Sequence, residues 1–501
     1  MRACFPISIL ILAISCLSLQ GQTDTAWIYT FGGQLDDACN QIRPVQGNGF
    51  IVCGTTNSFG TGNTSIYAIK IDSSCTHQWS AAFGGRGNQA GYAVTPTMDK
   101  GFAFVGFTNS YGNGGYDVFL VKTDSAGRLL WQKTYGGTDW DFGYSIKETT
   151  DGGFLISGLT FSYGAGGGDV YVIRTNQRGD TLWTKTYGGT GEDIGNAIAI
   201  TGDSLYTIAG STTSFGSRDT SIYLIQLDTA GNLKQSKTYG CRRNNVAYTI
   251  APTRDNGFIM MGSMDSVFAG IRGQTLLKTD GQGNQKWIEQ ITNGPWQDIG
   301  KDVVQAPDGS FLIAGTADGG GFGSSSMHIM HYDSAGNYLA GPSFGGNATQ
   351  CGNSVARSST GAVVFGGATT SYGNGNNDVF LVRFKNDSIG QNPRLLFHNF
   401  KDSLTVTGIG EQKTVNGSVR VFPNPMVSET GVYVQGSGSE KFTVKLYDTG
   451  GRCQLEQTPL HYMGHGLYEV HLQKGSLATG TYIYEVSDHT EVSYSGKLNV
   501  E

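Results

Sequence analysis

Four aspartates recur at equivalent places in this chain, each just before an expected strand: Asp37, Asp141, Asp193 and Asp298. Carboxylates gathered at one mouth of a channel could bind a cation or sugar hydroxyls, or serve as the paired acid and base of a glycosidase. Short polar side chains also cap the backbone amides of their own loops. The residues alone leave both roles open, and their repetition in several copies favours capping.

Two tryptophans and two arginines interrupt loops that are otherwise small and polar. Trp140 and Trp296 occupy matching places in two copies of a repeat, and Arg242 and Arg243 replace a glycine-rich stretch in another. Tryptophan and arginine dominate binding hot spots. Packing between repeats is the alternative for both tryptophans, because most large aromatic side chains are buried. The candidate ligand-binding residues are Trp140, Asp141, Asp193, Arg242, Arg243, Trp296 and Asp298.

Motifs for catalysis and metal binding are sparse, and no residue is assigned a catalytic role. His328 and His331 are three apart on an expected strand and therefore face opposite ways. No nucleophile elbow, phosphate loop or complete EF-hand loop is present. Asp139 and Asp141 form a D-x-D fragment, which supplies only part of the oxygen ligands that calcium needs. The sequence thus predicts no metal and no cofactor, with calcium as the one cation left open.

The elements that position these residues repeat along the chain. Trp27, Trp79, Trp131 and Trp183 are each 52 residues apart, and Trp287 lies two periods beyond the last of them. Periods near 50 residues are typical of propeller blades or arrays. In the copy that ends with Trp183, residues 143–149, 154–159, 169–175 and 181–187 form four short antiparallel strands between turn signals.

The turn between the third and fourth strands keeps its chemistry from copy to copy. An aspartate or asparagine is followed three residues later by glycine, which accepts positive φ at little cost. The glycines are Gly127, Gly179, Gly231, Gly283 and Gly336. The first copy has Cys75 instead, so we expect that turn to be strained or differently shaped.

Ring closure follows from counting strands. Seven fourth strands are present, but the first, around Trp27, precedes any first strand, and the last copy has only three strands. The N-terminal strand can therefore complete the last blade and remove the exposed edges of the ring. The predicted fold class is all-β, a seven-bladed β-propeller of four-stranded blades closed by the N-terminal strand. Its longer loops, and hence any ligand, belong to the face opposite the tight hairpins.

The aligned aromatic residues and glycines from residue 24 to about 385 resemble the quinoprotein-like and kelch-like β-propellers. In those families a fourth-strand tryptophan docks between blades. The resemblance is architectural, because one fold hosts many activities.

Residues 419–501 carry an ordered set of motifs. This region closely resembles the C-terminal type A sorting domain of the type IX secretion system. The resemblance implies a small β-sandwich that binds the type IX machinery and is removed by a sortase-like peptidase, often before attachment to the cell surface. The motif residues are Pro423, Asn424, Pro425, Gly451, Arg452, Gly480 and Tyr482.

The flanking segments and the charge complete the assignment. Residues 1–22 form a predicted secretory signal peptide, 23–385 the propeller, 386–418 a linker and 419–501 the sorting domain. No later apolar run is long enough to span a membrane. The formal net charge of −6 argues against nucleic acid and anionic membranes as partners.

Three functions remain open from the sequence. We expect a secreted or surface-anchored propeller that binds an extracellular glycan or protein without catalysis. The first alternative is a carbohydrate-active enzyme, a glycoside hydrolase or lyase, that uses the channel-mouth aspartates. The second is a structural surface-layer protein.

Overall fold

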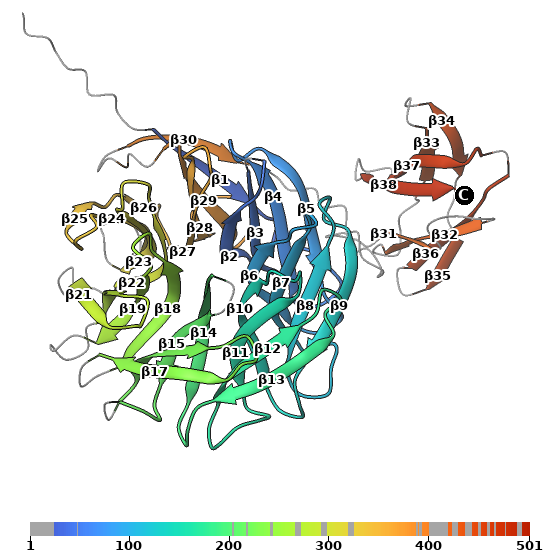
Figure 1. Ribbon diagram of the computed structural model, residues 1–501. Coiled ribbons are helices and arrows are strands. Elements are labelled where there is room, and N and C mark those ends of the chain that lie inside the picture. The colour runs from blue at the N-terminus through green and yellow to red at the C-terminus, as the bar shows by residue number, and fades with distance from the viewer. Residues whose placement is uncertain are drawn as a thin grey trace, which may run out of the picture.

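Strands and turns make up the whole of the described chain. The computed structural model describes residues 25–399 and 419–500 with gaps at 48, 203–204, 217–218, 241–243, 266–271, 292–297, 319–324, 387–388, 390–392, 423–428, 436–442, 449–451, 458–460, 465–466, 476 and 488–492. Its elements within these ranges are all strands, and those of residues 25–399 form seven sheets around a common axis (Figure 1). The expected signal peptide lies outside the described residues.

Six of the sheets are blades built from consecutive strands, each paired antiparallel with the next in sequence. Blades 1 to 3 consist of β2 (Asp37–Pro44), β3 (Gly49–Thr56), β4 (Ser65–Asp72), β5 (His77–Phe83); β6 (Gln89–Pro96), β7 (Phe102–Thr108), β8 (Asp117–Thr123), β9 (Leu129–Tyr135); and β10 (Asp141–Glu148), β11 (Phe154–Thr160), β12 (Asp169–Thr175), β13 (Thr181–Tyr187). Blades 4 to 6 consist of β14 (Asp193–Thr201), β15 (Leu205–Thr212), β16 (Ser221–Leu227), β17 (Leu233–Tyr239); β18 (Asn245–Pro252), β19 (Phe258–Asp265), β20 (Arg272–Thr279), β21 (Gln285–Ile291); and β22 (Asp298–Gln305), β23 (Phe311–Asp318), β24 (Ser325–Tyr332), with β25 (Tyr338–Ala340) and β26 (Ser343–Phe344) sharing the outer edge.

The seventh blade contains both the first and the last strands of the propeller. It is built from β27 (Gln350–Arg357), β28 (Val363–Thr369) and β29 (Asp378–Phe384), followed by β1 (Thr25–Phe31) and β30 (Arg394–Asn399). β1 pairs antiparallel with β29 from Ala26 opposite Phe384 to Phe31 opposite Val379. The predicted closure by the N-terminal strand is therefore confirmed.

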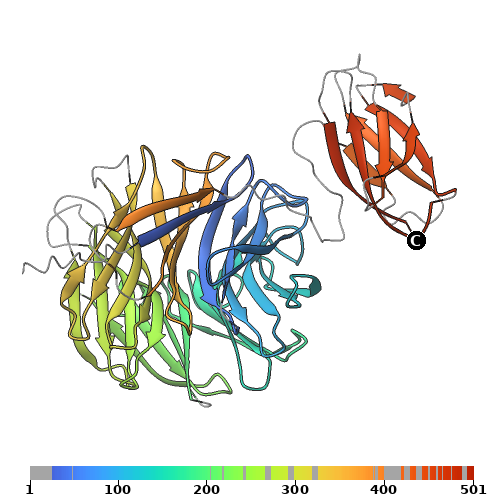
Figure 2. The same ribbon diagram turned by 90° about the horizontal axis from the view of Figure 1, so that it is seen from above.

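A fifth strand was not expected in this blade. β30 pairs parallel with β1, with Thr25 opposite Arg394, and the two strands run side by side in Figure 2. The sequence predicts a linker over residues 386–418, but Arg394–Asn399 within it form the outer strand of blade 7. β1 is covered on both edges as a result.

The hydrophobic core of the ring consists of seven clusters, one between each pair of neighbouring blades. One cluster joins Phe31, Val379 and Leu381 of blade 7 to Phe50 and Tyr67 of blade 1, so the contact that closes the ring has the same character as the other six. Buried third strands such as β12, which is apolar at consecutive positions, fit sheets that are covered on both faces.

The tryptophans in register explain why the turn glycines repeat with them. Four of them, Trp79, Trp131, Trp183 and Trp287, lie over the third-to-fourth turn of the next blade. A Cβ on Gly127 would lie 2.7 Å from the Trp79 ring, and one on Gly231 would lie 2.8 Å from the Trp183 ring. These glycines also have positive φ, 79° and 74°. A larger residue there would meet both the ring and an unfavourable backbone, so tryptophan and glycine form one inter-blade contact.

The turn with Cys75 keeps the hydrogen bonds of the glycine turns, with Cys75 N donating to Asp72 O at 3.0 Å, so it is strained and not differently shaped. Cys75 has a φ of 62°, a conformation that costs a side-chain-bearing residue about 1–2 kcal/mol. The neighbouring strands β1 and β29 hold this turn by hydrogen bonds, because Tyr29 Oη donates to Ser74 O at 2.7 Å and Arg383 Nε donates to Ser73 O at 2.7 Å.

The C-terminal region is a separate pair of sheets. One contains β31 (Val419–Phe422), β32 (Glu429–Gln435), β36 (Leu467–Gln473) and β35 (His461–Gly464); the other contains β34 (Cys453–Gln457), β33 (Thr443–Tyr447), β37 (Gly480–Ser487) and β38 (Ser493–Val500). Val432 and Leu472 from the first sheet and Leu446 and Tyr484 from the second share one buried cluster. This is the expected small β-sandwich.

Candidate ligand-binding site

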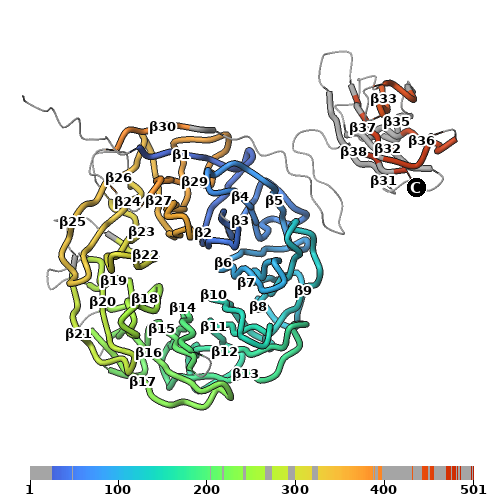
Figure 3. Tube along the Cα trace, turned by 45° about the horizontal axis from the view of Figure 1, so that its top comes forward, coloured from blue at the N-terminus to red at the C-terminus, as the bar shows by residue number. Residues whose placement is uncertain are grey.

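The first strand of every blade surrounds the axis of the ring and carries a β-bulge (Figure 3). A bulge leaves one residue unpaired and can redirect its side chain. The seven residues at the bulges are Asn40, Tyr92, Tyr144, Asn196, Tyr248, Lys301 and Asn353. Because the residue type differs from blade to blade, the repeated scaffold presents an asymmetric inner surface.

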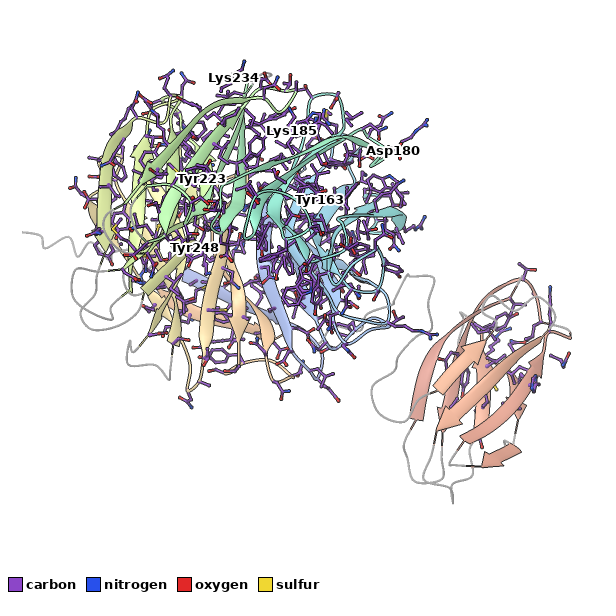
Figure 4. All side chains as sticks on the ribbon, turned by 90° about the horizontal axis from the view of Figure 1, so that it is seen from below. Tyr163, Asp180, Lys185, Tyr223, Lys234 and Tyr248 are labelled. Atoms are coloured by element: carbon purple, nitrogen blue, oxygen red, sulfur yellow. The ribbon has the colours of Figure 1, made fainter. Side chains whose placement is uncertain are left out.

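Three of these residues tie neighbouring blades together. Asn40 Nδ2 donates to Gly91 O at 2.8 Å, and Asn196 and Asn353 make the same bond to the next blade at 2.9 Å. Lys301 instead places its ammonium 4.0 Å from the centre of the Tyr248 ring, which Figure 4 labels. Tyr92 and Tyr144 belong to a larger aromatic cluster.

Six aromatic side chains form a continuous cluster on blades 2 and 3, which we call the aromatic wall: Tyr92, Phe107, Tyr116, Trp140, Phe142 and Tyr144. Phe142 is its centre, with ring centroids 5.5 Å from Phe107, 5.8 Å from Tyr116 and 6.2 Å from Tyr144. Tyr92, on the first strand of blade 2, makes a second contact between the two blades, at 5.4 Å from Tyr144.

The wall is accessible although its members pack on one another. Trp140 is 51% exposed, and the other five are partly exposed. Trp140 is held at the edge of the wall by a bridge between its backbone and that of Tyr116, and the two rings meet edge to face at 5.8 Å. Of the predicted site residues whose side chains are described, Trp140 is the one that lies in this surface.

Sequence reasoning missed the other five members of the wall. Phe142 and Tyr144 are the first and third residues after Asp141, and the corresponding residues after Asp193 are Ile194 and Asn196. Aromatic residues at both positions of one copy are a usable signal. Their contact with Tyr92 could not be seen, because it depends on two bulges in adjacent blades.

The predicted aspartates take the first position of their strands and turn into the loops. Asp141 is fully buried, and its Oδ2 accepts hydrogen bonds from Gly137 N at 2.8 Å and Ser162 Oγ at 2.7 Å. Asp193 makes the same two contacts with Gly189 N and Ser214 Oγ, at 2.8 and 2.6 Å.

Asp37 repeats the arrangement at the start of β2 in blade 1. Its Oδ2 accepts from Gly33 N at 2.7 Å and Ser58 Oγ at 2.6 Å. Burial raises the pKa of this carboxyl, and the donors from Ser58 and Gly33 oppose the rise. The three side chains thus cap the loops that flank them, which is the simpler of the two roles that the sequence left open.

The remaining predicted site residues cannot be placed in the same way. Arg242, Arg243 and Trp296 lie outside the described residues. Asp298 begins β22 opposite Ala317, and only its backbone is described. No side-chain contact between these four residues and the aromatic wall is therefore described.

Charged side chains from the first strands of three blades interact with one another. Arg43 of blade 1 forms an ion pair of 2.9 Å with Asp302 of blade 6, and Ser354 Oγ donates to the same carboxylate at 2.6 Å. Lys147 of blade 3 interacts electrostatically with both Arg43 and Asp302. Burial, and next the Arg43 charge, lower the pKa of Lys147 to about 8.

Metal-binding side chains do not gather in the described part of the chain. No group of three or more histidines, cysteines, aspartates and glutamates is placed to hold an ion there. His328 is buried, and His331 shares a hydrogen bond of 2.9 Å with Ser310. Asp139, the other half of the D-x-D fragment, accepts from the backbone amide of Trp140.

The sorting motif is described in part. Tyr482 is buried in the sandwich and donates to Ala478 O at 3.0 Å, and Gly480 begins β37. The backbone amide of Arg452 is capped by the Asp448 carboxylate at 3.0 Å. Pro423, Asn424, Pro425 and Gly451 lie outside the described residues.

The propeller has distant structural similarities. They include Sqt1 from Chaetomium thermophilum (13% identical, TM-score 0.41, covering 69% of this chain and 83% of that one) and the Pyrococcus horikoshii acylaminoacyl peptidase (10%, 0.41, 81% and 59%). The β-propeller domain of the Trilobed protease from Pyrococcus furiosus is a third (10%, 0.40, 74% and 96%). The propeller assignment rests on the strand pairing described above and not on these scores.

In sequence, the chain is similar to the regulatory protein FlaEY of Caulobacter vibrioides, with 28% identity over 185 residues. The match covers 30% of this chain and 19% of that protein, so the chain spans about a fifth of its relative. Among the described residues no helix is long and apolar enough to cross a membrane.

The C-terminal region gives the most specific match. Residues 420–501 match the family described as the secretion system C-terminal sorting domain. This domain is the address of the type IX secretion system, and it marks the protein for export to the cell surface or the extracellular space.

Proposed function

We propose that the exported propeller binds a glycan on its aromatic wall without chemically altering it. The observation that carries this proposal is the exposed ring cluster centred on Phe142 and ending at Trp140. Sugar rings present apolar C–H faces that pack on aromatic faces, while their hydroxyl groups need hydrogen-bond partners. Tyr92, Tyr116 and Tyr144 bring phenolic groups, which can donate and accept such bonds, to the same surface.

The scaffold around the wall also favours binding. Each wall residue is on a rigid strand or on a loop tied to one, so little ordering is needed when a ligand arrives. The net charge of −6 makes a nucleic acid a poor alternative for the same aromatic surface.

The aspartates that a glycosidase would use already have another role. Asp141 and Asp193 are fully buried and each accepts two hydrogen bonds from its own loops. A general acid and base must reach the scissile bond, and two capping groups inside the loops do not. Binding without turnover is therefore the function that this arrangement favours.

The test is a binding screen of the full chain against soluble neutral and acidic polysaccharides by isothermal titration calorimetry. We expect Phe142→Ala and Trp140→Ala each to weaken binding by roughly 5- to 150-fold, the effect of losing about 1–3 kcal/mol of stacking. Phe215→Ala is the matched control, because Phe215 is 42% exposed and lies outside the wall.

Three outcomes would contradict the proposal. If no polysaccharide bound saturably, the proposed class of ligand would be wrong. If both wall variants bound with unchanged affinity, the proposed location of the site would be wrong. New reducing ends in the mixture would show turnover and favour the enzyme that the sequence left open.

A further inference from the structure

Lys301 differs in charge from the other residues at the bulges of the first strands. Three of the seven bulge residues are asparagines and three are tyrosines, so Lys301 is the charged one among them. All seven are partly exposed, whereas the residue before each of them is buried. Solvent therefore reaches this ring of bulge residues, and a ligand bound at its level can contact Lys301.

Lys301 lies across the ring from the aromatic wall. It belongs to blade 6, and in a closed ring of seven blades the two farthest from blade 6 are blades 2 and 3, each three steps away; Figure 3 shows β22 opposite β6 and β10. Tyr92 and Tyr144 are the bulge residues of blades 2 and 3 and members of the wall. A ligand in the centre of the ring thus has aromatic rings on one side and an ammonium on the other.

Neighbouring blades are joined at this position without any charge. Asn40, Asn196 and Asn353 each donate a hydrogen bond from Nδ2 to a backbone carbonyl of the next blade. A lysine side chain loses more conformational freedom than most when it is held in one place. The scaffold therefore does not require the ammonium of Lys301.

The ammonium of Lys301 is held in place but not neutralised. Its Nζ lies 4.0 Å from the centre of the Tyr248 ring, a cation–π contact that leaves N–H donors for other partners. No ion pair of Lys301 occurs among the described residues. The neighbouring carboxylate of Asp302 is already paired with Arg43 and accepts a hydrogen bond from Ser354. The donors of Lys301 are available to an anionic ligand.

The charged cluster on the same inner strands also has an excess of positive charge. Arg43 and Lys147 are basic, and in the described part of the chain Asp302 is the carboxylate that interacts with both. The capping aspartates at the starts of the first strands of blades 1, 3 and 4 are buried and accept hydrogen bonds from their own loops. This local excess favours an anionic ligand, although the whole chain has a net charge of −6.

We infer that the aromatic wall and Lys301 together bind an acidic polysaccharide. One sugar ring packs on the wall, and an anionic substituent of the polymer, a carboxylate or a sulfate ester, accepts hydrogen bonds from the Lys301 ammonium. A lysine is a flexible point charge and therefore suits either group. The inference rests on the proposed glycan-binding function and names the class of glycan that the site selects.

The experiment is isothermal titration calorimetry of the full chain with two matched pairs of polymers: polygalacturonate with its methyl ester, and dextran sulfate with dextran. We expect the acidic member of one pair to bind about 10-fold or more tightly than its neutral partner, and that pair identifies the anionic group. Lys301→Met keeps an apolar stem and should abolish this preference while leaving the affinity for the neutral member within about twofold. Lys301→Arg should retain the preference.

Lys185→Met is the matched control. Lys185 also lies over an aromatic ring, 5.8 Å from the centre of Trp183, but on the outer strand β13, and Figure 4 labels it. It should leave all affinities unchanged.

The outcomes separate this inference from the function on which it rests. Equal affinity for acidic and neutral polymers, or a preference that persists in Lys301→Met, would overturn the inference alone, provided that Phe142→Ala still weakens binding. Binding confined to neutral polysaccharides would do the same. A protein that bound no polysaccharide would contradict the glycan proposal and the inference together.

Discussion

The closing strand offers the sharpest test of the fold. Phe31 at the end of β1 is 1% exposed and packs with Phe50 and Tyr67 of blade 1, across the point where the ring closes. Replacing a buried phenylalanine by alanine costs about 3–5 kcal/mol. Since domains are stable by about 5–15 kcal/mol, Phe31→Ala should remove a large part of the stability of the propeller.

A matched variant separates the role of closure from that of ordinary packing. Phe83 ends β5 at the equivalent position of blade 1 and is 3% exposed. If β1 is a full member of blade 7, Phe31→Ala and Phe83→Ala should cost the same within about 1 kcal/mol. Leu130→Ala, with Leu130 54% exposed on the outer strand β9, should stay within about 0.5 kcal/mol of the wild type.

The assay is denaturant unfolding of the full chain followed by tryptophan fluorescence. Deleting residues 23–33 is the stronger form of the same perturbation, because it removes β1 from between β29 and β30. A Phe31→Ala protein that unfolds at the wild-type midpoint, while Phe83→Ala does not, would refute the closure argument.

Two further predictions concern stability. Gly231→Ala should lower the free energy of unfolding, measured with denaturant, by about 1–3 kcal/mol or more, because the new Cβ meets the Trp183 ring and the backbone has positive φ. Gly47→Ala is the control, since Gly47 has positive φ but open space around it, and it should cost less. Equal effects of the two substitutions would contradict the clash with Trp183. The pKa of Lys147 is lowered from 10.5 to about 8 in the folded protein. Above pH 8 the folded protein therefore loses the Lys147 proton while the unfolded chain keeps it. The free energy of unfolding should then rise with pH by up to about 1.4 kcal/mol per pH unit, relative to the Lys147→Met protein. Parallel stability profiles of the two proteins between pH 8 and 9.5 would show that Lys147 titrates normally.

Much of the fold was predictable because the same pattern of strands and turns recurs at a constant spacing along the chain. The spacing from Trp79 to Trp183 and the glycines three residues after each turn aspartate gave the blade, its hairpins and the closing strand. β30 could not be predicted, because residues 394–399 belong to no repeat and pair with β1, a strand from the other end of the propeller sequence.

The site was predictable in part. Trp140 broke the repeat and proved to be at the edge of the aromatic wall, but Tyr92 and Tyr144 were not recognised as neighbours. Their approach depends on where bulges turn side chains, which single-strand periodicity does not report.

The pairing of β1 with β29 also constrains the order of folding. Ala26 contacts Phe384, so the last contact of the ring joins residues from opposite ends of the propeller sequence. Contacts of such long range form slowly, because the entropy of closing the loop must be lost before they contribute any stability. Six blades can form from strands that are neighbours in the sequence, whereas β1, an apolar strand near the N-terminus, has both edges unpaired until β29 and β30 reach it. A protein that is exported to the cell surface or the extracellular space thus carries, at the start of its propeller, a strand whose two edges are paired only by residues from the far end of the ring.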